Sequence, residues 1–181
     1  GTLLASAGIF GAAIALGAQD VLKNLFGSVA LLADKPFRVG DRIRFEEYDG
    51  FVEDIGLRST RLRLLSGHLL SLPNEKLANN DVENVTNRAH ILRNATIHIP
   101  LDTPGEKVQK AVSIIRDHLA NHEGMTPDYP PRVFFEEFDA SAFSIRFFYW
   151  YSPPNRWEFM AFSEKLNFAI FREFEEHGIQ F

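Results

Sequence analysis

Two histidines at a helical spacing are the first candidates for chemistry in this sequence. His118 and His122 are four residues apart, a spacing at which two imidazoles on one face of a helix can bind zinc. The surrounding letters, HLANHE, lack the glutamate that a HExxH motif places directly after the first histidine. A zinc site is therefore a minor expectation, and an ordinary pair on a helix is favoured.

The other reactive residue types are arranged in ways that do not favour catalysis. The sequence contains no cysteine, which excludes a disulfide framework, a thiolate nucleophile and a cysteine-based zinc site. Ser66-Gly67-His68 is typical of a turn, and the neighbouring acids Glu136-Glu137 point to opposite sides of a strand. We therefore predict no catalytic residue, no cofactor and no metal, and expect that the protein is not an enzyme.

The elements that could position functional residues begin with a long apolar segment. From Leu3 to Ala18 sixteen residues carry no charge, and small residues recur at spacings of three and four. A straight helix of this length spans about 24 Å, less than the roughly 30 Å hydrocarbon core of a bilayer, so both a membrane helix and a buried soluble helix are allowed. Glycine weakens a helix in water but lets helices pack closely in a bilayer, which favours a helix packed against copies of itself.

An amphipathic stretch continues this helix. Gln19, Asp20, Lys23 and Asn24 share one face, and the change of character at Gln19-Asp20 predicts a bend. Pro36 ends the helix, and four basic residues lie close to it: Lys35, Arg38, Arg42 and Arg44. Such a cluster indicates the cytoplasmic side of a membrane or, alternatively, a solvated loop.

Residues 42–73 predict a small β module. Short alternating segments cover Arg42–Glu46, Phe51–Leu57, Ser59–Leu65 and His68–Leu72, with a turn at Tyr48-Asp49-Gly50 and a short helix over Asn74–Asn79. Strands of this length between tight turns favour a small barrel or sandwich. Arg58, Arg61 and Arg63 could face a nucleic acid, but no aromatic residue lies between them and the net charge of the chain is −5.

From Ile91 onward the pattern changes to mixed helices and strands. It predicts strands over 91–99, 132–138 and 143–151, and helices over 104–122 and 155–177, an order that resembles a ferredoxin-like α+β layer. The strand Ser144–Tyr151 is aromatic on both faces, which predicts cover on both sides, from its own helices or from a second copy. Thirteen acidic and eight basic residues over 94–181 predict a modest enrichment of cations nearby.

Several motifs in a fixed order carry a family resemblance. GAQDVLKNLFGSVALL, KPFRVGDRIRF, GFVEDIGLRSTRLRLLSGHLLSLPNEKL and VENVTNR together resemble the small-conductance mechanosensitive channel (MscS-type) family. The resemblance implies a kinked membrane pore helix over 1–33, a small all-β (Sm-like) domain over 34–90 and an α+β ferredoxin-like vestibule domain over 91–181. It also implies that the outer transmembrane helices and the final strand of the family are missing from this chain.

The resemblance also implies partners and a location. We expect a homo-oligomer, a heptamer in this family, with membrane lipid as a further partner and no nucleic acid. The membrane is an inner or organellar one, with the residues after about position 34 on its cytoplasmic, matrix or stromal side.

Roles for individual residues follow from the resemblance when Gln19 is taken as the fixed point. The constriction of the pore falls at Leu16 and Ala12, where alanine departs from the bulky family type, and Phe10 and Ile9 are further candidates. The ridge that packs neighbouring helices falls at Gly8, Gly11, Ala13 and Ala15. Hinge and coupling positions fall at Gln19, Asp20, Leu22, Asn24, Gly27 and Ser28.

The function implied is that of a mechanosensitive ion channel. Membrane tension would open a weakly selective pore, closed at rest by a ring of apolar side chains that excludes water, and release ions and small osmolytes on hypoosmotic shock. Two alternatives remain open at this point. One is a soluble homo-oligomeric scaffold with an Sm-like barrel, and the other is an RNA-binding module.

Overall fold

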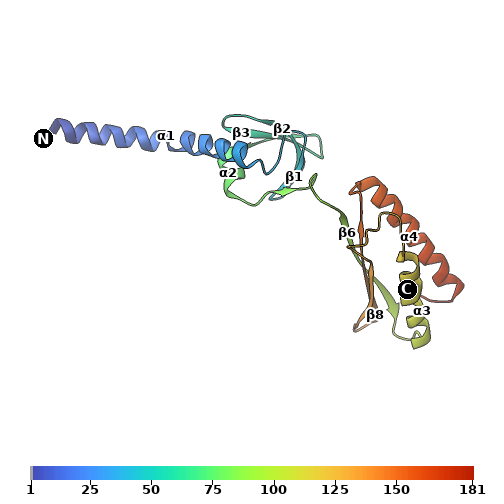
Figure 1. Cartoon of the computed structure of the whole chain (residues 1–181). Helices are drawn as coiled ribbons and strands as arrows, with labels where there is room; N and C mark the ends of the chain where they lie inside the picture. The colour runs from blue at the N-terminus through green and yellow to red at the C-terminus, as the bar shows by residue number, and fades with distance from the viewer. Residues whose placement is uncertain (1) are drawn as a thin grey trace. The chain divides into compact units, whose positions relative to one another are not determined.

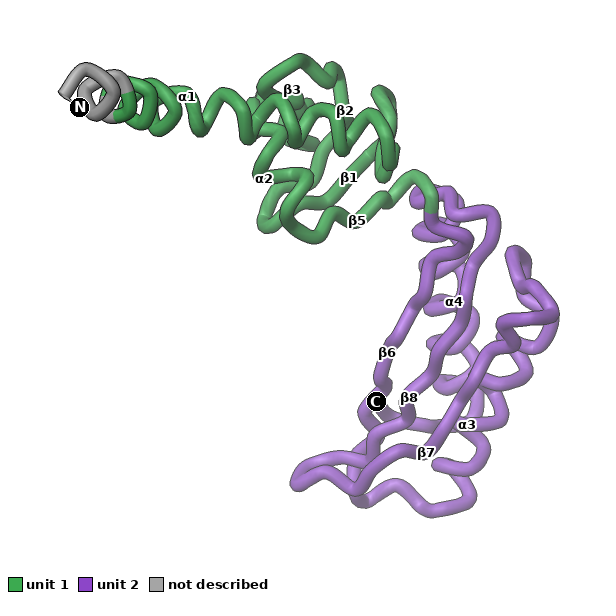
Figure 2. The backbone as a smooth tube through the Cα atoms, turned by 60° about the vertical axis from the view of Figure 1, so that its left-hand side comes forward, with its two compact units in different colours: residues 1–87 green, residues 88–181 purple. Residues whose placement is uncertain are grey.

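The structure is a computed structural model that describes the backbone of residues 2–181, with the side chains of residue 8 and residues 10–181. It divides into two compact units, unit 1 over residues 1–87 and unit 2 over residues 88–181 (Figure 2). Unit 1 contains α1 (Thr2–Asp34), β1 (Arg42–Phe45), β2 (Tyr48–Ile55), β3 (Ser59–Leu64), β4 (Leu69–Pro73), α2 (Asn74–Asn79) and β5 (Glu83–Asn84) (Figure 1). Unit 2 contains β6 (Ile91–Pro100), α3 (Gly105–Leu119), β7 (Arg132–Phe138), β8 (Ala142–Tyr151) and α4 (Arg156–Glu176).

Unit 1 is built on an antiparallel five-stranded sheet in the order β4-β3-β2-β1-β5. Successive side chains of a strand point to opposite faces, so Ile43 and Phe45 are fully buried while Arg44 between them is exposed. The long helix α1 contributes to the same core through Leu31. The core of unit 1 comprises Leu31, Phe37, Ile43, Phe45, Val52, Leu62, Leu72 and Leu77.

The turn predicted at Tyr48-Asp49-Gly50 is wrong, because these residues begin β2. The chain reverses at Glu46 and Glu47, between β1 and β2. Glu46 adopts a positive φ of 51°, and Phe45 pairs with Tyr48. Gly50 serves a different purpose, since a Cβ atom at this position would stand 2.5 Å from the carbonyl oxygen of Arg63. The glycine allows β2 and β3 to approach closely rather than allowing a turn.

The exposed face of this sheet carries ion pairs between neighbouring strands. Arg61 lies 2.9 Å from Asp54, and the Nε atom of Arg63 lies 2.7 Å from a carboxylate oxygen of Glu53. Both arginines belong to the set that could have faced a nucleic acid. Their charges are instead matched by acidic residues on β2, which does not favour a phosphate-binding surface.

Unit 2 consists of an antiparallel sheet in the order β6-β8-β7 with α3 and α4 packed on it. The aromatic strand β8 buries Ile145, Phe147 and Tyr149 among residues of the two helices. On its other face Trp150 contacts the ring of Tyr129, with ring centroids 5.7 Å apart. Unit 2 therefore covers most of the inward face of β8 and part of the outward face with its own residues.

The predicted end of the first helix of unit 2 is also wrong. Helix α3 ends at Leu119, and Asn121 has a positive φ of 84°, so His122 lies beyond the helix. His118 instead pairs with Glu173 of α4 at 2.8 Å, whereas His122 is buried between Phe162 and Tyr149. The two imidazoles do not share a ligand site, and within the described residues no group of three or more metal-binding side chains occurs.

His122 is expected to make the stability of unit 2 sensitive to acid. Its Nδ1 atom lies 2.7 Å from the carbonyl oxygen of Glu123, its Nε2 atom is buried with no partner among the described residues, and burial lowers the pKa of the ring. The nearby charges are Glu123 and its partner Lys165. Because the pKa of His122 is lower in the folded state than the value of about 6.5 in the unfolded chain, its contribution to stability is fully present above that pH and is lost as the pH falls further.

Tryptophan fluorescence can measure this effect because both tryptophans, Trp150 and Trp157, lie in unit 2. We expect the urea midpoint to be lower at pH 5.5 than at pH 7.5, by an amount that His122→Phe removes. His98→Gln, at an exposed histidine of the same unit, should keep the pH difference of the unmodified chain. A pH difference that survives in His122→Phe would assign the acid sensitivity to another group.

Candidate functional site

Helix α1 is a single helix whose first half makes few contacts within its own unit (Figure 1). The side chains of Phe10, Ile14 and Leu16 are each about seven-tenths exposed, and an added Cβ atom at Gly11 or Gly17 would meet nothing within 4 Å. Among the helices of the described residues, none combines the length and the apolar character needed to cross a bilayer. Within the described part of this half, Phe10, Ile14 and Leu16 leave apolar surface uncovered.

The exposed residues of this half are sorted around the helix by size. At about 100° per residue, Ala12, Leu16 and Asp20 form one stripe roughly 80° wide. Small residues flank this stripe on both sides, and the bulky Phe10 and Ile14 lie on the opposite face. The flanking residues are Gly8, Gly11 and Ala15 on one side and Ala13 and Gly17 on the other. Small flanks of this kind allow close approach of neighbouring helices.

The second half of α1 is joined to α2 at a backbone-to-backbone contact. An added Cβ atom at Gly27 would stand 2.7 Å from the backbone nitrogen of Glu75. The same nitrogen donates to the side-chain oxygen of Asn24 at 3.4 Å, and Lys23 lies 3.9 Å from the carboxylate of Glu75. Glycine is needed here because the two helices touch through their main chains.

A buried polar network completes this joint. The amide nitrogen of Asn74 donates to the hydroxyl of Ser28 at 2.7 Å and to the carbonyl oxygen of Gly56 at 2.7 Å. Its amide oxygen accepts from the hydroxyl of Thr60 at 2.8 Å, and Ser28 donates to the carbonyl oxygen of Leu57 at 2.6 Å. Asn74 and Thr60 are fully buried, so each of these groups depends on its partner. We call Ser28, Asn74, Thr60 and the two loop carbonyls the joint network.

Gly27→Ala is expected to destabilise unit 1 by about 1–3 kcal/mol, because overlap with the main chain of Glu75 outweighs the gain in helix propensity. Gly17→Ala is the matched control, since the added methyl group meets nothing within 4 Å. Hydrogen exchange of the amides of α1 and α2 would measure both. Equal protection in the two variants would contradict a tight contact at Gly27.

The structure brings together only some of the positions predicted for the site. Asn24, Gly27 and Ser28 are buried and contact α2 or the neighbouring loop. Gln19 and Asp20 are exposed, and Leu22 is about half exposed. The predicted gate and packing positions Ala12, Leu16, Gly8, Gly11, Ala13 and Ala15 are exposed in the single chain, and the side chain of Ile9 lies outside the described residues.

Sequence reasoning missed the residues that complete the joint. Asn74 follows Pro73 at the end of β4, and the sequence pattern predicts only that it begins a short helix. Its signal was a side chain able to donate and accept directly after a buried strand, in the motif LPNEKL. Thr60 carried no signal beyond the alternation of its strand.

A second group of polar residues meets in unit 2 without forming a catalytic arrangement. The hydroxyl of Ser144 donates to the carboxylate of Asp139, and the same oxygen lies 3.2 Å from Nδ1 of His98. In a serine nucleophile the histidine stands between the hydroxyl and the acid. Here the hydroxyl donates its hydrogen bond directly to the acid, so the arrangement ties β8 to β6 and to the loop between β7 and β8.

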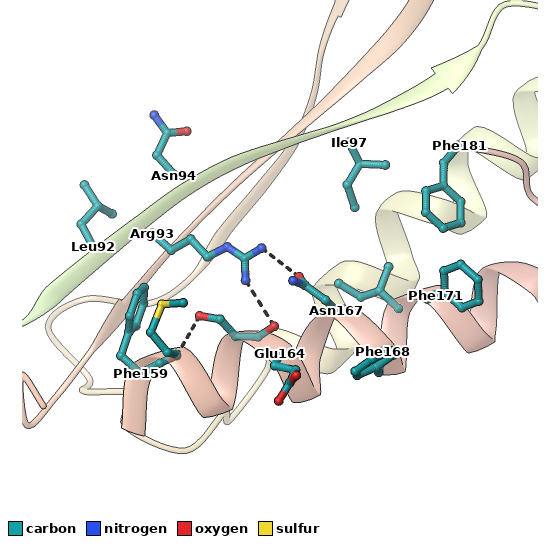
Figure 3. Close-up of a pocket in the computed structure, with 13 residues that line it drawn as sticks. Leu92, Arg93, Asn94, Ile97, Phe159, Glu164, Asn167, Phe168, Phe171 and Phe181 are labelled. Atoms are coloured by element: carbon teal, nitrogen blue, oxygen red, sulfur yellow. Dashed lines mark hydrogen bonds between the residues drawn. The ribbon is translucent and has the colours of Figure 1, made fainter. Parts of the chain in front are cut away.

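A groove of about 730 Å³ runs between β6 and α4 (Figure 3). Arg93 crosses it and donates to the side-chain oxygen of Asn167 at 2.8 Å and to the carbonyl oxygen of Ser163 at 3.4 Å. Its guanidinium also stands 5.5 Å from the ring centroid of Phe147. Arg93 therefore holds the strand against the helix.

Comparison with known proteins assigns this arrangement to a family. Residues 20–87 match the family described as "Mechanosensitive ion channel, beta-domain", and residues 94–181 match "Mechanosensitive ion channel MscS, C-terminal". The chain belongs to the MscS family of mechanosensitive ion channels. This confirms the resemblance and the fold class predicted from the motifs.

Two curated relatives come from Methanocaldococcus jannaschii. The chain is 36% identical over 184 residues to the large-conductance mechanosensitive channel MscMJLR, covering 99% of this chain and 50% of the relative. It is 35% identical over 178 residues to the small-conductance channel MscMJ, covering 98% and 50%. The chain thus spans about half the length of these MscS-family relatives.

Solved structures show the same fold. Helicobacter pylori MscS in a closed state matches with a TM-score of 0.80 and 24% identity, over 99% of this chain and 69% of that one. Arabidopsis thaliana MSL1 matches with a TM-score of 0.85 and 19% identity, over 98% and 64%. MscS proteins are membrane channels rather than enzymes, and the joint network lies within the part of the chain that matches the family's β domain.

Proposed function

We propose that this chain forms the pore helix and vestibule of a homo-oligomeric mechanosensitive channel that opens under membrane tension. In the family it resembles, seven copies surround one pore, and a heptamer is the assembly proposed here. The observation that carries the proposal is the arrangement of α1, in which the stripe of Ala12, Leu16 and Asp20 is flanked by small residues and the second half of the helix is joined to the β unit by buried contacts. Ions and small osmolytes would leave through a weakly selective pore on hypoosmotic shock.

The closed gate is assigned to Leu16. Its side chain is 71% exposed in the single chain and stands on the stripe between Ala12 and Asp20. A ring of leucine side chains narrows a pore until water leaves it, which blocks ions without a plug. Ala12 contributes little bulk, so Leu16 is the main constriction, and Ile9 is the remaining candidate on the side of the pore nearer the start of α1.

Opening is assigned to movement of the first half of α1 against its neighbours. Tension favours the state with the larger area in the membrane plane, and the flanks of glycine and alanine let the helices tilt and slide past one another. Asn24, Gly27 and Ser28 anchor the second half to the β unit, so a bend between the halves, at Gln19-Asp20, would let the gate move while the joint holds. Leu22, about half exposed, is assigned to contact with outer helices.

The vestibule is assigned to the side of the membrane on which residues after about 34 lie, the cytoplasmic, matrix or stromal side. Four basic residues close to the end of α1 support this orientation: Lys35, Arg38, Arg42 and Arg44. The domain boundaries proposed are 1–33 for the pore helix, 34–90 for the β domain and 91–181 for the vestibule domain.

Patch recordings of the complete protein in liposomes test this function. Suction applied to an excised patch should evoke currents whose open probability rises with tension. Patches from liposomes without protein provide the baseline. A protein that inserts into the liposomes but passes no current up to the tension that ruptures the patch would contradict the proposal.

A further inference from the structure

Asp20 is the one acidic residue within residues 2–33 of α1, and its side chain is 90% exposed. It follows Leu16 by four residues, which places it about 6 Å further along the helix and close to the same line. The polar residues that follow it on the helix, Lys23 and Asn24, contact Glu75 of α2. Asp20 is therefore the last residue of the stripe with no contact to the β unit through its own side chain.

The charge of Asp20 is only partly matched. The amine of Lys23 lies 4.0 Å from its carboxylate and 3.9 Å from the carboxylate of Glu75 on α2. One lysine thus stands between two carboxylates, and the group of three carries a net charge of −1. The side chain of Lys23 is 44% exposed, so solvent further weakens its hold on either partner.

We propose that Asp20 is a selectivity-determining residue, forming a ring of carboxylates one helical turn beyond the Leu16 gate that gives the open pore a preference for cations. This inference rests on the proposed function, since a ring exists only when copies of α1 surround a pore. Rings of acidic side chains favour cations because they raise the local concentration of positive ions and repel negative ones.

The position of the ring decides how strongly it acts. A charge beside a narrow passage acts on every ion that crosses, whereas charges in a wide vestibule are screened over about 8 Å at physiological salt. The excess of acidic over basic residues across 94–181 therefore contributes less to the cation preference than the number of charges suggests. The preference should be several-fold at low salt and shrink as the salt concentration rises.

Reversal potentials of the tension-activated current in a KCl gradient test the inference. Asp20→Asn should shift the reversal potential of the complete protein most of the way to that of a nonselective pore, and Asp20→Lys should move it to the anion side. Asp34→Asn, which removes the exposed acid at the other end of the same helix, is the matched control and should leave it unchanged. Lys23→Gln should increase the cation preference, which gives an independent test if a change at position 20 prevents opening.

The outcomes separate this inference from the proposed function. Tension-activated currents with the same reversal potential in the unmodified protein, Asp20→Asn and Lys23→Gln would overturn the role of Asp20 and leave the channel intact. An absence of tension-activated current in the unmodified protein would instead overturn the proposed function, and the inference with it.

Discussion

Replacing Leu16 with serine is expected to open the channel at lower tension and to leave a leak at rest. The apolar side chain of Leu16 lies on the stripe and is 71% exposed in the single chain. Replacing this side chain by serine makes contact with water more favourable by about 1.5 kcal/mol in each copy, because an apolar side chain is lost. Because the ring multiplies this change, the closed pore should rehydrate and the closed–open equilibrium shift by orders of magnitude.

Ile14→Ser provides the matched control for the gate. Ile14 is also 71% exposed but lies on the opposite face of α1, two residues away. Patch recordings should show a lowered threshold and a resting current only for Leu16→Ser. If the two variants share one threshold, or if Leu16→Ser keeps that of the unmodified protein, Leu16 is not the gate.

The second large effect is expected from Asn74→Ala. This change removes both hydrogen-bonding ends of the side chain at the centre of the joint network and leaves the hydroxyl of Thr60 and the carbonyl oxygen of Gly56 without their partner. Buried polar groups that lose a partner are costly, so unit 1 should lose about 3 kcal/mol of stability. The second half of α1 should also detach more readily from α2.

Hydrogen exchange can separate the two consequences of Asn74→Ala. Loss of protection should be largest in the second half of α1, in α2 and in the loop between β2 and β3, while unit 2 keeps its protection. Asn79→Ala, at the exposed end of α2, removes the same side chain without touching the network. A protection pattern equal to that of Asn79→Ala would show that the network does not hold the joint.

Most of the architecture could be predicted from local patterns in the sequence. Alternation along β1 and β3 and the three-and-four spacing in α3 and α4 gave elements close to those observed, because burial follows the period of the backbone. Two local errors had tertiary causes. The turn expected at Gly50 is absent because this glycine allows β2 and β3 to approach closely. The helix expected to reach His122 ends earlier, and His122 packs among aromatic side chains beyond it.

The candidate site could be predicted only in part, for a related reason. The family resemblance predicts that Asn24 faces the β domain and assigns Gly27 and Ser28 to a hinge. Nothing local to Asn74 indicated that its amide would contact a serine 46 positions earlier in the chain. Contacts between segments so far apart depend on the whole fold of unit 1. Ala12 and Leu16 are the converse case, since both side chains are exposed within the described part of the chain and the role proposed for them needs neighbouring copies.

The mass of the complete protein's assembly in a mild detergent tests the central claim most directly. If α1 is one wall segment of a shared pore, native mass spectrometry should detect a closed ring of several copies, seven if the assembly is that of the family it resembles, with no substantial population of single chains. A particle with the mass of one chain, obtained under conditions in which both units remain folded, would contradict the account.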